Sequence, residues 1–300
     1  MHVLITGASG LVGQRLTDSL KAEGHQVTRM VRSAPQPEEA LWNYRDRQID
    51  LDKLATGDAV IHLAGENVAG GRWTDAKKRR ILESREQGTR FLAESLAQLS
   101  KRAGILISAS ATGFYGSRGD EILTEQSEPG QGFLPKVCLA WERACQPAVE
   151  AGVRVAHVRI GIVLSAKGGA LAKMLLPFKL GVGGRIGSGQ QWWSWITLDD
   201  LVRVIQYVLM TDALQGPVNA TSPNPVTNQE FTKTLGRVLK RPTVFPMPSF
   251  AARWALGEMA DELLLASARV LPQRLQEHGF EFHHSELEPA LRHALQDAGA

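Results

Sequence analysis

The chain has 300 residues, 22% of them charged, and its 34 Lys and Arg against 31 Asp and Glu give a formal net charge of +3. A chain of this length buries one large core or two modest ones, and so small a charge excess does not favour a nucleic-acid partner. No apolar run approaches the roughly 20 residues of a membrane span and no signal-peptide pattern is seen, so we expect no membrane contact.

The two cysteines, Cys138 and Cys145, stand on one predicted helix. Their separation along such a helix is about 10 Å, which is beyond the reach of a disulfide. They indicate neither an oxidising compartment nor a metal site, and we expect a cytoplasmic protein without a bound metal.

The first predicted elements are a strand, a glycine-rich turn and a helix. Val3 to Ile5 is apolar and partly β-branched, which indicates a buried parallel strand, and the leucines from Leu11 to Leu20 fall at helical spacing. Between them, Gly7 permits a tight turn, Gly10 lets a pyrophosphate approach the backbone, and Gly13 lets the helix pack closely.

This strand–turn–helix context favours a dinucleotide site over the alternative, an ordinary glycine-rich turn. The N-terminus of the helix would present unpaired N–H groups and the positive end of its dipole to the phosphates. The residues expected to hold the pyrophosphate are Gly7, Ser9, Gly10, Leu11 and Val12.

The end of the second predicted strand, His25 to Val31, indicates which dinucleotide is bound. A site for NAD usually has an acid here to accept from the ribose 2′-hydroxyl, but the sequence has no acid between Glu23 and Glu38. Arg32 and Ser33 stand there instead, and a guanidinium with a hydroxyl suits a 2′-phosphate. NADP(H) is therefore the expected cofactor; the alternative is that Arg32 is a solvated loop charge.

Asp58 to Gly65 predicts a further buried strand that ends in small residues. We expect Leu63, Ala64 and Gly65 to border the ribose and nicotinamide of the cofactor, because these lie across the strand ends. His62 lies inside the apolar run, so we interpret it as a core histidine and not as a ligand or base.

A long helix is predicted from the cap Thr74 to about Leu99, with Lys77 to Arg80 on its solvated face. Arg85 lies midway along it and is either a contact to a cofactor phosphate or a surface ion-pair former. The strand that follows, from Ile105, carries Ser108 and then Ser110. Ser108 is expected at the cofactor and Ser110 where a substrate carbonyl or alcohol would be held.

A helix from Phe133 to Ala151 and a strand from Val153 to Ile160 complete an alternation of strands and helices, which predicts an α/β fold with a doubly wound parallel sheet, a Rossmann domain.

We expect this NADP-binding domain to comprise residues 1–164 and about 190–221. A smaller lobe, about 165–189 with 222–300, would cap the substrate side. Its predicted elements include a helix over 170–178, a helix over 228–239, a strand over 280–282 and a final helix from Ser285. Trp192, Trp193 and Trp195 either stack a substrate ring or pack the two lobes together.

Several motifs together resemble the extended short-chain dehydrogenases/reductases over about residues 1–245. They are Thr6-Gly7-x-x-Gly10-x-x-Gly13, Asp58-x-Val60-x-His62-Leu63-Ala64-Gly65, Ser108-x-Ser110, Val158-Arg159, Trp195-Ile196-x-x-Asp199-Asp200 and Asn219. Two further stretches resemble the atypical "epimerase family" branch, related to NAD-dependent epimerases and dehydratases, with its small C-terminal domain of unknown function. These are Gly183-Gly184-x-Ile186-Gly187-Ser188-Gly189 and Leu271-Pro272-x-Arg274-Leu275 with Gly279-Phe280.

The chain departs from that superfamily at the catalytic pair. Active members carry Tyr-x-x-x-Lys, in which the lysine lowers the pKa of the tyrosine; here the corresponding positions hold Leu134 and Cys138, which cannot do this chemistry. Ser110 falls at the position of the family's catalytic hydroxyl residue. Tyr115 is a candidate for a relocated acid or base, the alternative being a packing role, whereas Lys136 is expected to face elsewhere.

Three interpretations follow from the resemblance and this departure. The chain is an NADP(H)-dependent oxidoreductase or epimerase-like enzyme with a relocated acid/base, a non-catalytic NADP(H)-binding redox sensor, or an interaction protein whose glycine turn is a relic. The intact turn and Arg32 argue against the third. The substrate is expected to be a small molecule, and the protein a monomer or a homodimer.

Overall fold

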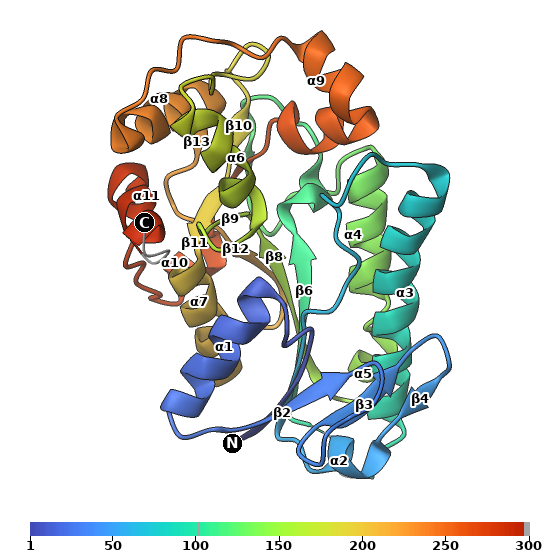
Figure 1. Ribbon diagram of the computed structural model, residues 1–300. Coiled ribbons are helices and arrows are strands. Elements are labelled where there is room, and N and C mark those ends of the chain that lie inside the picture. The colour runs from blue at the N-terminus through green and yellow to red at the C-terminus, as the bar shows by residue number, and fades with distance from the viewer. Residues whose placement is uncertain (101–102, 297–300) are drawn as a thin grey trace.

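A mostly parallel sheet forms the centre of the protein, in a computed structural model that describes residues 1–100 and 103–296 (Figure 1). Its strands follow the order β12-β8-β6-β5-β1-β2-β3-β4, and every neighbouring pair is parallel except β3 and β4. The strands are β1 (His2–Thr6), β2 (Gln26–Val31), β3 (Ala40–Asn43), β4 (Gln48–Ile49), β5 (Ala59–His62), β6 (Ile105–Ala111), β8 (Arg154–Ile160) and β12 (Gly216–Ala220). The predicted doubly wound α/β fold is confirmed.

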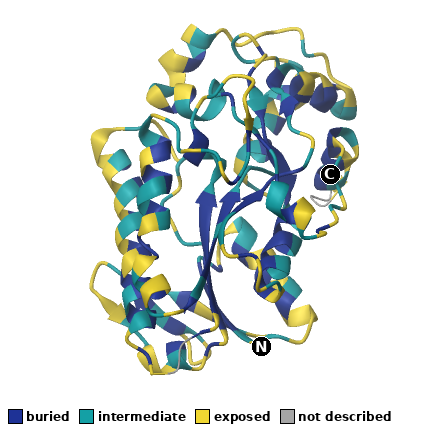
Figure 2. Ribbon diagram, turned by 180° about the vertical axis from the view of Figure 1, so that it is seen from behind, coloured by how far each residue is buried: buried dark blue, intermediate teal, exposed yellow. Residues whose placement is uncertain are grey.

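Helices cover both faces of this sheet, and the alternating side chains of β1 show which helices cover each face. Val3 and Ile5 pack into one core with helices α1 (Leu11–Ala22) and α7 (Leu198–Met210), whereas Leu4 packs into the core on the other face. That second face is covered by α2 (Leu51–Ala55), α3 (Asp75–Ala97), α4 (Phe133–Arg143) and α5 (Gln146–Glu150). Figure 2 shows the strands buried along their length while the outer helix faces are exposed. A strand buried on both sides reads as a continuous apolar run, as β1 does.

A third hydrophobic core lies beyond the carboxyl ends of the central strands, at the top of Figure 1. Trp193 and Trp195 are 3% and 0% exposed within it, so these two rings pack the structure and do not stack a substrate. The elements of this region are β9 (Ile162–Leu164), α6 (Gly169–Lys179), β10 (Trp192–Trp193), β11 (Trp195–Thr197), β13 (Val226–Thr227), α8 (Asn228–Leu239), α9 (Ser249–Leu256), a π-helical turn (Ala260–Leu264) and α11 (Leu287–Gln296).

Two predicted elements are wrong in detail. The helix expected over 133–151 is divided into α4 and α5, because Pro147 at the start of α5 has no N–H to continue the hydrogen-bond ladder. The strand expected at Phe280 to Phe282 is irregular chain. The two rings pack edge to face there, with centroids 4.8 Å apart, and the next two backbone N–H groups donate to the carboxylate of Asp200 instead of to a strand.

The remaining short elements connect the two regions. Strand β7 (Ile122–Leu123) pairs with β14 (Arg269–Val270), a one-turn 3₁₀ helix (Thr112–Tyr115) follows β6, and α10 (Gln273–Glu277) precedes the final segment. Leu275 and Phe280, which the sequence assigned to the capping lobe, pack in the core beside α1 and α7. Within the described residues, no helix has both the length and the hydrophobicity to cross a membrane.

Candidate functional site

The glycine turn between β1 and α1 has no room for side chains. Gly7 has a φ of +70°, and a Cβ there would lie 2.8 Å from the backbone nitrogen of Ala64. A Cβ on Gly13 would overlap the carbonyl oxygen of Gly7. The N–H of Gly10 donates to that same oxygen at 3.0 Å, which closes the turn. The three glycines therefore have the geometric roles that a dinucleotide turn requires.

The N-terminus of α1 is open. Its N-cap is Gly10, which has no side chain to accept from the helix N–H groups, and the first turn of the helix contains no acid. Ser9 and Gly10 are exposed, while Leu11 and Val12 are half-buried. A Cβ added to Gly10 would have only one neighbour within 4 Å, the oxygen of Gly7. Free N–H groups at the positive end of a helix dipole fit a pyrophosphate.

Arg32 and Ser33 lie directly after β2, beside the glycine turn. Residues Thr6 and Met30 are paired in the parallel register of β1 and β2, so both strands end at the same edge of the sheet. Arg32 is exposed and has no hydrogen-bond or ion-pair partner among the described residues. The side chain is therefore available to a 2′-phosphate.

The end of β5 is tied to β1 by a buried histidine. His62 is fully buried, its Nδ1 lies 2.7 Å from Oγ1 of Thr6, and the N–H of Ala64 donates to the same oxygen. Burial lowers the pKa of His62 to about 3, with a further lowering by the charge of Arg85. The ring is therefore a neutral core histidine, as expected. Its contacts hold Leu63 and Ala64 against the back of Gly7.

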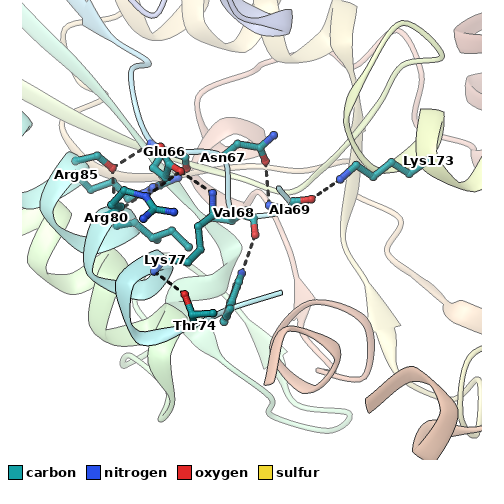
Figure 3. A network of polar contacts seen from close by, with 12 residues as sticks. Glu66, Asn67, Val68, Ala69, Thr74, Lys77, Arg80, Arg85 and Lys173 are labelled. Atoms are coloured by element: carbon teal, nitrogen blue, oxygen red, sulfur yellow. Dashed lines mark hydrogen bonds and ion pairs between the residues drawn. The ribbon is translucent and has the colours of Figure 1, made fainter. Parts of the chain in front are cut away.

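A polar network that was not predicted from the sequence surrounds Glu66, in the loop after β5 (Figure 3). The carboxylate of Glu66 lies 2.6 Å from Nζ of Lys77 and 3.7 Å from Nε of Arg80. The hydrogen bond from Lys77 is the largest cause that lowers the pKa of Glu66. Lys77 is buried, so the predicted solvated face of α3 is wrong at this position. From α6, Lys173 donates to the carbonyl of Ala69 and joins this loop to the C-terminal region.

Arg85 lies beneath this loop and is not a surface ion-pair former. Its Nη1 donates to the backbone oxygens of Glu66 at 3.0 Å and Ile81 at 3.2 Å. Its guanidinium carbon lies 4.8 Å from the ring centroid of Trp141. A Cβ on Gly65 would lie 3.2 Å from that carbon, so the guanidinium covers the end of β5.

Ser108 is level with His62, the last residue of β5, and its side chain is buried. It is fully buried in the middle of β6, paired with His62 and His157 on the neighbouring strands, and its side chain contacts Cys145. Even-numbered residues of β6 point toward the face covered by α3 and α5, because side chains alternate along a strand. The Ser108 side chain therefore packs on this face of the sheet, and its expected contact to the cofactor stays a prediction.

Ser110 begins a chain of buried hydrogen bonds. Its Oγ donates to Oε1 of Glu142 at 2.7 Å, and Arg159 holds both oxygens of that carboxylate at 2.8 Å. Nη1 of Arg159 donates to the hydroxyl of Tyr115 at 2.9 Å, and this hydroxyl donates to Oδ1 of Asn219 at 2.7 Å. The network joins β6, α4, β8 and β12 at the carboxyl end of the sheet.

Tyr115 packs in the interior, which is the alternative role that the sequence left open. Its side chain is fully buried, and burial raises its pKa to about 12, outweighing the lowering by Arg159 and Asn219. A relocated acid or base needs the opposite shift. The environment of Tyr115 therefore opposes the expected catalytic role and suits a group that orders the network.

Helix α4 has apolar residues at the two positions that correspond to the Tyr-x-x-x-Lys pair. Leu134 and Cys138 are 8% and 2% exposed, and burial raises the pKa of Cys138 to about 12, so it is not an activated nucleophile. Lys136 faces solvent, as expected. The N-terminus of this helix is capped from a distance, because the carboxylate of Glu262 accepts from the N–H groups of Phe133 and Leu134 at 3.0 Å each. In the described part of the chain, no group of His, Cys, Asp and Glu could hold a metal ion.

Family models match two parts of the chain. The NAD dependent epimerase/dehydratase family matches residues 3–220, and a domain of unknown function, DUF1731, matches residues 247–294. The first match contains the glycine turn, Arg32 and the network that begins at Ser110. The second contains Glu262 and the final helix.

Relatives match nearly the whole length of this chain. An epimerase family protein of Mycobacterium bovis is 44% identical over 99% of this chain and 98% of its own length. A chloroplastic epimerase family protein SDR39U1 homolog of Arabidopsis thaliana is 38% identical over 99% of this chain and 87% of its own. The crystal structure of human epimerase family protein SDR39U1 (isoform 2) with NADPH aligns with a TM-score of 0.89 and 32% identity, covering 99% of this chain and 100% of that one.

Proposed function

Because this chain belongs to the NAD dependent epimerase/dehydratase family, we propose that it binds NADP(H) and carries out oxidoreductase or epimerase-like chemistry on a small molecule. The observation that carries the choice of NADP(H) is Arg32, an exposed guanidinium at the end of β2 that has no partner among the described residues, where no acid stands. The human neighbour that was crystallised with NADPH supports it.

The open turn and the strand ends fit this cofactor. The N–H groups around Gly7, Ser9, Gly10, Leu11 and Val12 would hold the pyrophosphate, Arg32 and Ser33 the 2′-phosphate, and Leu63, Ala64 and Gly65 would border the nicotinamide half. When bound, the nicotinamide supplies a hydride donor or acceptor. The residues of this chain bind it, orient it and exclude water from it.

Ser110 is the hydroxyl that we propose to contact the substrate. Ser110 is 2% exposed, its proton is directed at Glu142, and its side chain also contacts Cys138. A remaining lone pair of its oxygen would accept a hydrogen bond from a substrate alcohol. Arg159 fixes Glu142 with both carboxylate oxygens engaged, and Tyr115 fixes Arg159 in turn. Ser110 would thus hold a substrate oxygen in a set position beside the cofactor.

A second candidate function is a non-catalytic NADP(H)-binding redox sensor. The specific observation that favours it is the apolar pair Leu134 and Cys138, both buried where active relatives carry an acid and its activating lysine. Screening a metabolite library for hydride exchange with labelled NADPH separates the two: exchange with any substrate supports the enzyme, and binding without exchange supports the sensor.

The remaining assignments are part of the same proposal. We assign the cofactor domain to residues 1–164 and about 190–221, and the capping lobe to about 165–189 and 222–300, apart from the segment around Leu275 and Phe280 that packs with α1. We also propose a cytoplasmic protein that is a monomer or a homodimer, and size-exclusion chromatography with light scattering tests the oligomeric state. Titration of the protein with NADPH and NADH tests the proposed cofactor; tighter binding of NADH would contradict it.

A further inference from the structure

Arg85 is a cation without a carboxylate partner in the described part of the chain. One of its nitrogens, Nη1, donates to two backbone oxygens, and no described residue accepts from Nε or Nη2. The nearest acid, Glu66, offers Arg85 its backbone oxygen, because its carboxylate is engaged by Lys77 and Arg80. Three cations against one carboxylate leave a surplus of positive charge at this loop.

The surroundings of Arg85 make such a charge costly. The guanidinium lies between Gly65 and the ring of Trp141, and burial lowers its pKa despite the opposing influence of Cys138 and Glu66. A buried charge destabilises a fold unless an anion or a set of hydrogen bonds compensates it. Only Nη1 of the guanidinium has hydrogen-bond acceptors among the described residues, as expected of a group that binds an anionic ligand.

Arg85 and the glycine turn come from elements on opposite faces of the sheet. The glycine turn leads into α1, on one face of the sheet, whereas Arg85 comes from α3 and contacts α4 on the other face. Trp141 lies on α4 less than one turn after Cys138, the position at which relatives carry the catalytic lysine. Arg85 thus extends from α3 toward the place of the missing cation.

We propose that the free side of the Arg85 guanidinium binds an anionic group, a carboxylate or a phosphate, of this protein's substrate. The inference rests on the proposed function and adds the chemical class of its substrate. Nε and Nη2 present the planar pair of donors that such oxyanions accept in a bidentate manner. Gly65 permits the approach because it has no Cβ, and Lys77 and Arg80 add a favourable field.

The experiment uses oxalate and inorganic phosphate as probes, titrated against the protein with and without NADPH. Binding is followed by the shift in melting temperature and, in the complex, by NADPH fluorescence. Comparing oxalate with phosphate separates a carboxylate site from a phosphate site. We expect Arg85→Gln to weaken binding of the preferred probe at least tenfold and Arg85→Lys to weaken it less. The matched control is Arg90→Gln, at an exposed arginine of the same helix without a partner in the described ranges, and it should change nothing.

Two further readouts distinguish binding from a structural or cofactor role. NADPH affinity should be unchanged in Arg85→Gln, and Arg85→Lys, which keeps the charge, should retain part of the probe binding. A parallel loss of NADPH affinity, or equal probe binding by wild type and Arg85→Gln, would overturn the inference. Failure of NADPH to bind the wild type would contradict the proposed function alone, since the probes are also titrated without cofactor.

Discussion

Arg159 holds both carboxylate oxygens of Glu142 at 2.8 Å, and the two side chains are only 4% and 11% exposed. The guanidinium carbon also lies 3.5 Å from the ring centroid of Phe114. A bidentate pair in this setting orders the carboxyl end of the sheet, because Ser110 and Tyr115 each depend on one partner of it.

Arg159→Met should therefore destabilise the protein strongly. Removing one partner of a buried pair leaves an uncompensated charge, which costs about 3–5 kcal/mol of unfolding free energy. Urea unfolding measures this change. The control is Arg292→Met, which breaks a pair with Glu288 at the surface and should have little effect. Equal effects of the two substitutions would show that the buried pair is not the anchor of this region.

Tyr115→Phe should reduce stability without reducing cofactor affinity. The substitution leaves Oδ1 of Asn219 without its donor and Nη1 of Arg159 without its acceptor, at a cost of about 1–3 kcal/mol. Urea unfolding and NADPH titration of the variant check both parts.

Once a substrate is known, Ser110→Ala should lower turnover roughly a hundredfold, whereas Tyr115→Phe should leave most of it. The reverse order would restore Tyr115 as the acid or base.

The pH dependence of stability should carry the signature of His62. Its pKa is about 3 in the folded protein against 6.5 ordinarily, so as pH falls below 6.5 the unfolded chain binds a proton that the folded chain does not. Stability fully present above pH 6.5 is therefore lost as pH falls toward 3, by up to about 1.4 kcal/mol per pH unit.

The measurement is the loss of unfolding free energy between pH 7 and pH 5, determined with urea. We expect this loss to be about 2 kcal/mol smaller in His62→Asn than in the wild type. His283→Asn, at an exposed histidine, should keep the wild-type dependence. Identical pH profiles for all three proteins would mean that His62 is protonated in the fold.

Local patterns were sufficient to predict the sheet, the glycine turn and most helix bounds. The turn depends on residues within seven positions of one another, so Gly7, Gly10 and Gly13 carry its geometry in the sequence itself. Thr74 was likewise identifiable as a helix cap, and its side chain accepts from the N–H of Lys77.

The interior of the site could not be predicted in the same way. The contact between Arg85 and Trp141 and the cap that Glu262 provides for α4 join residues far apart in the chain. The burial of the Ser108 side chain could not be predicted either, because residue type does not reveal which face of a buried strand a side chain occupies. A signal for Glu66 did exist: a lone acid just after β5, followed by the basic run that begins at Lys77.

The central claim is that this protein binds NADP(H) through Arg32, and titration of the Arg32→Ala variant with NADPH and NADH tests it most directly. Loss of a charge-assisted contact of about 1.5–3 kcal/mol should weaken NADPH binding tenfold or more and leave NADH binding nearly unchanged. Arg90→Ala, at an exposed arginine that also lacks a partner within the described residues, should alter neither affinity. Equal losses for NADPH and NADH in Arg32→Ala, or no loss for either, would contradict the assignment.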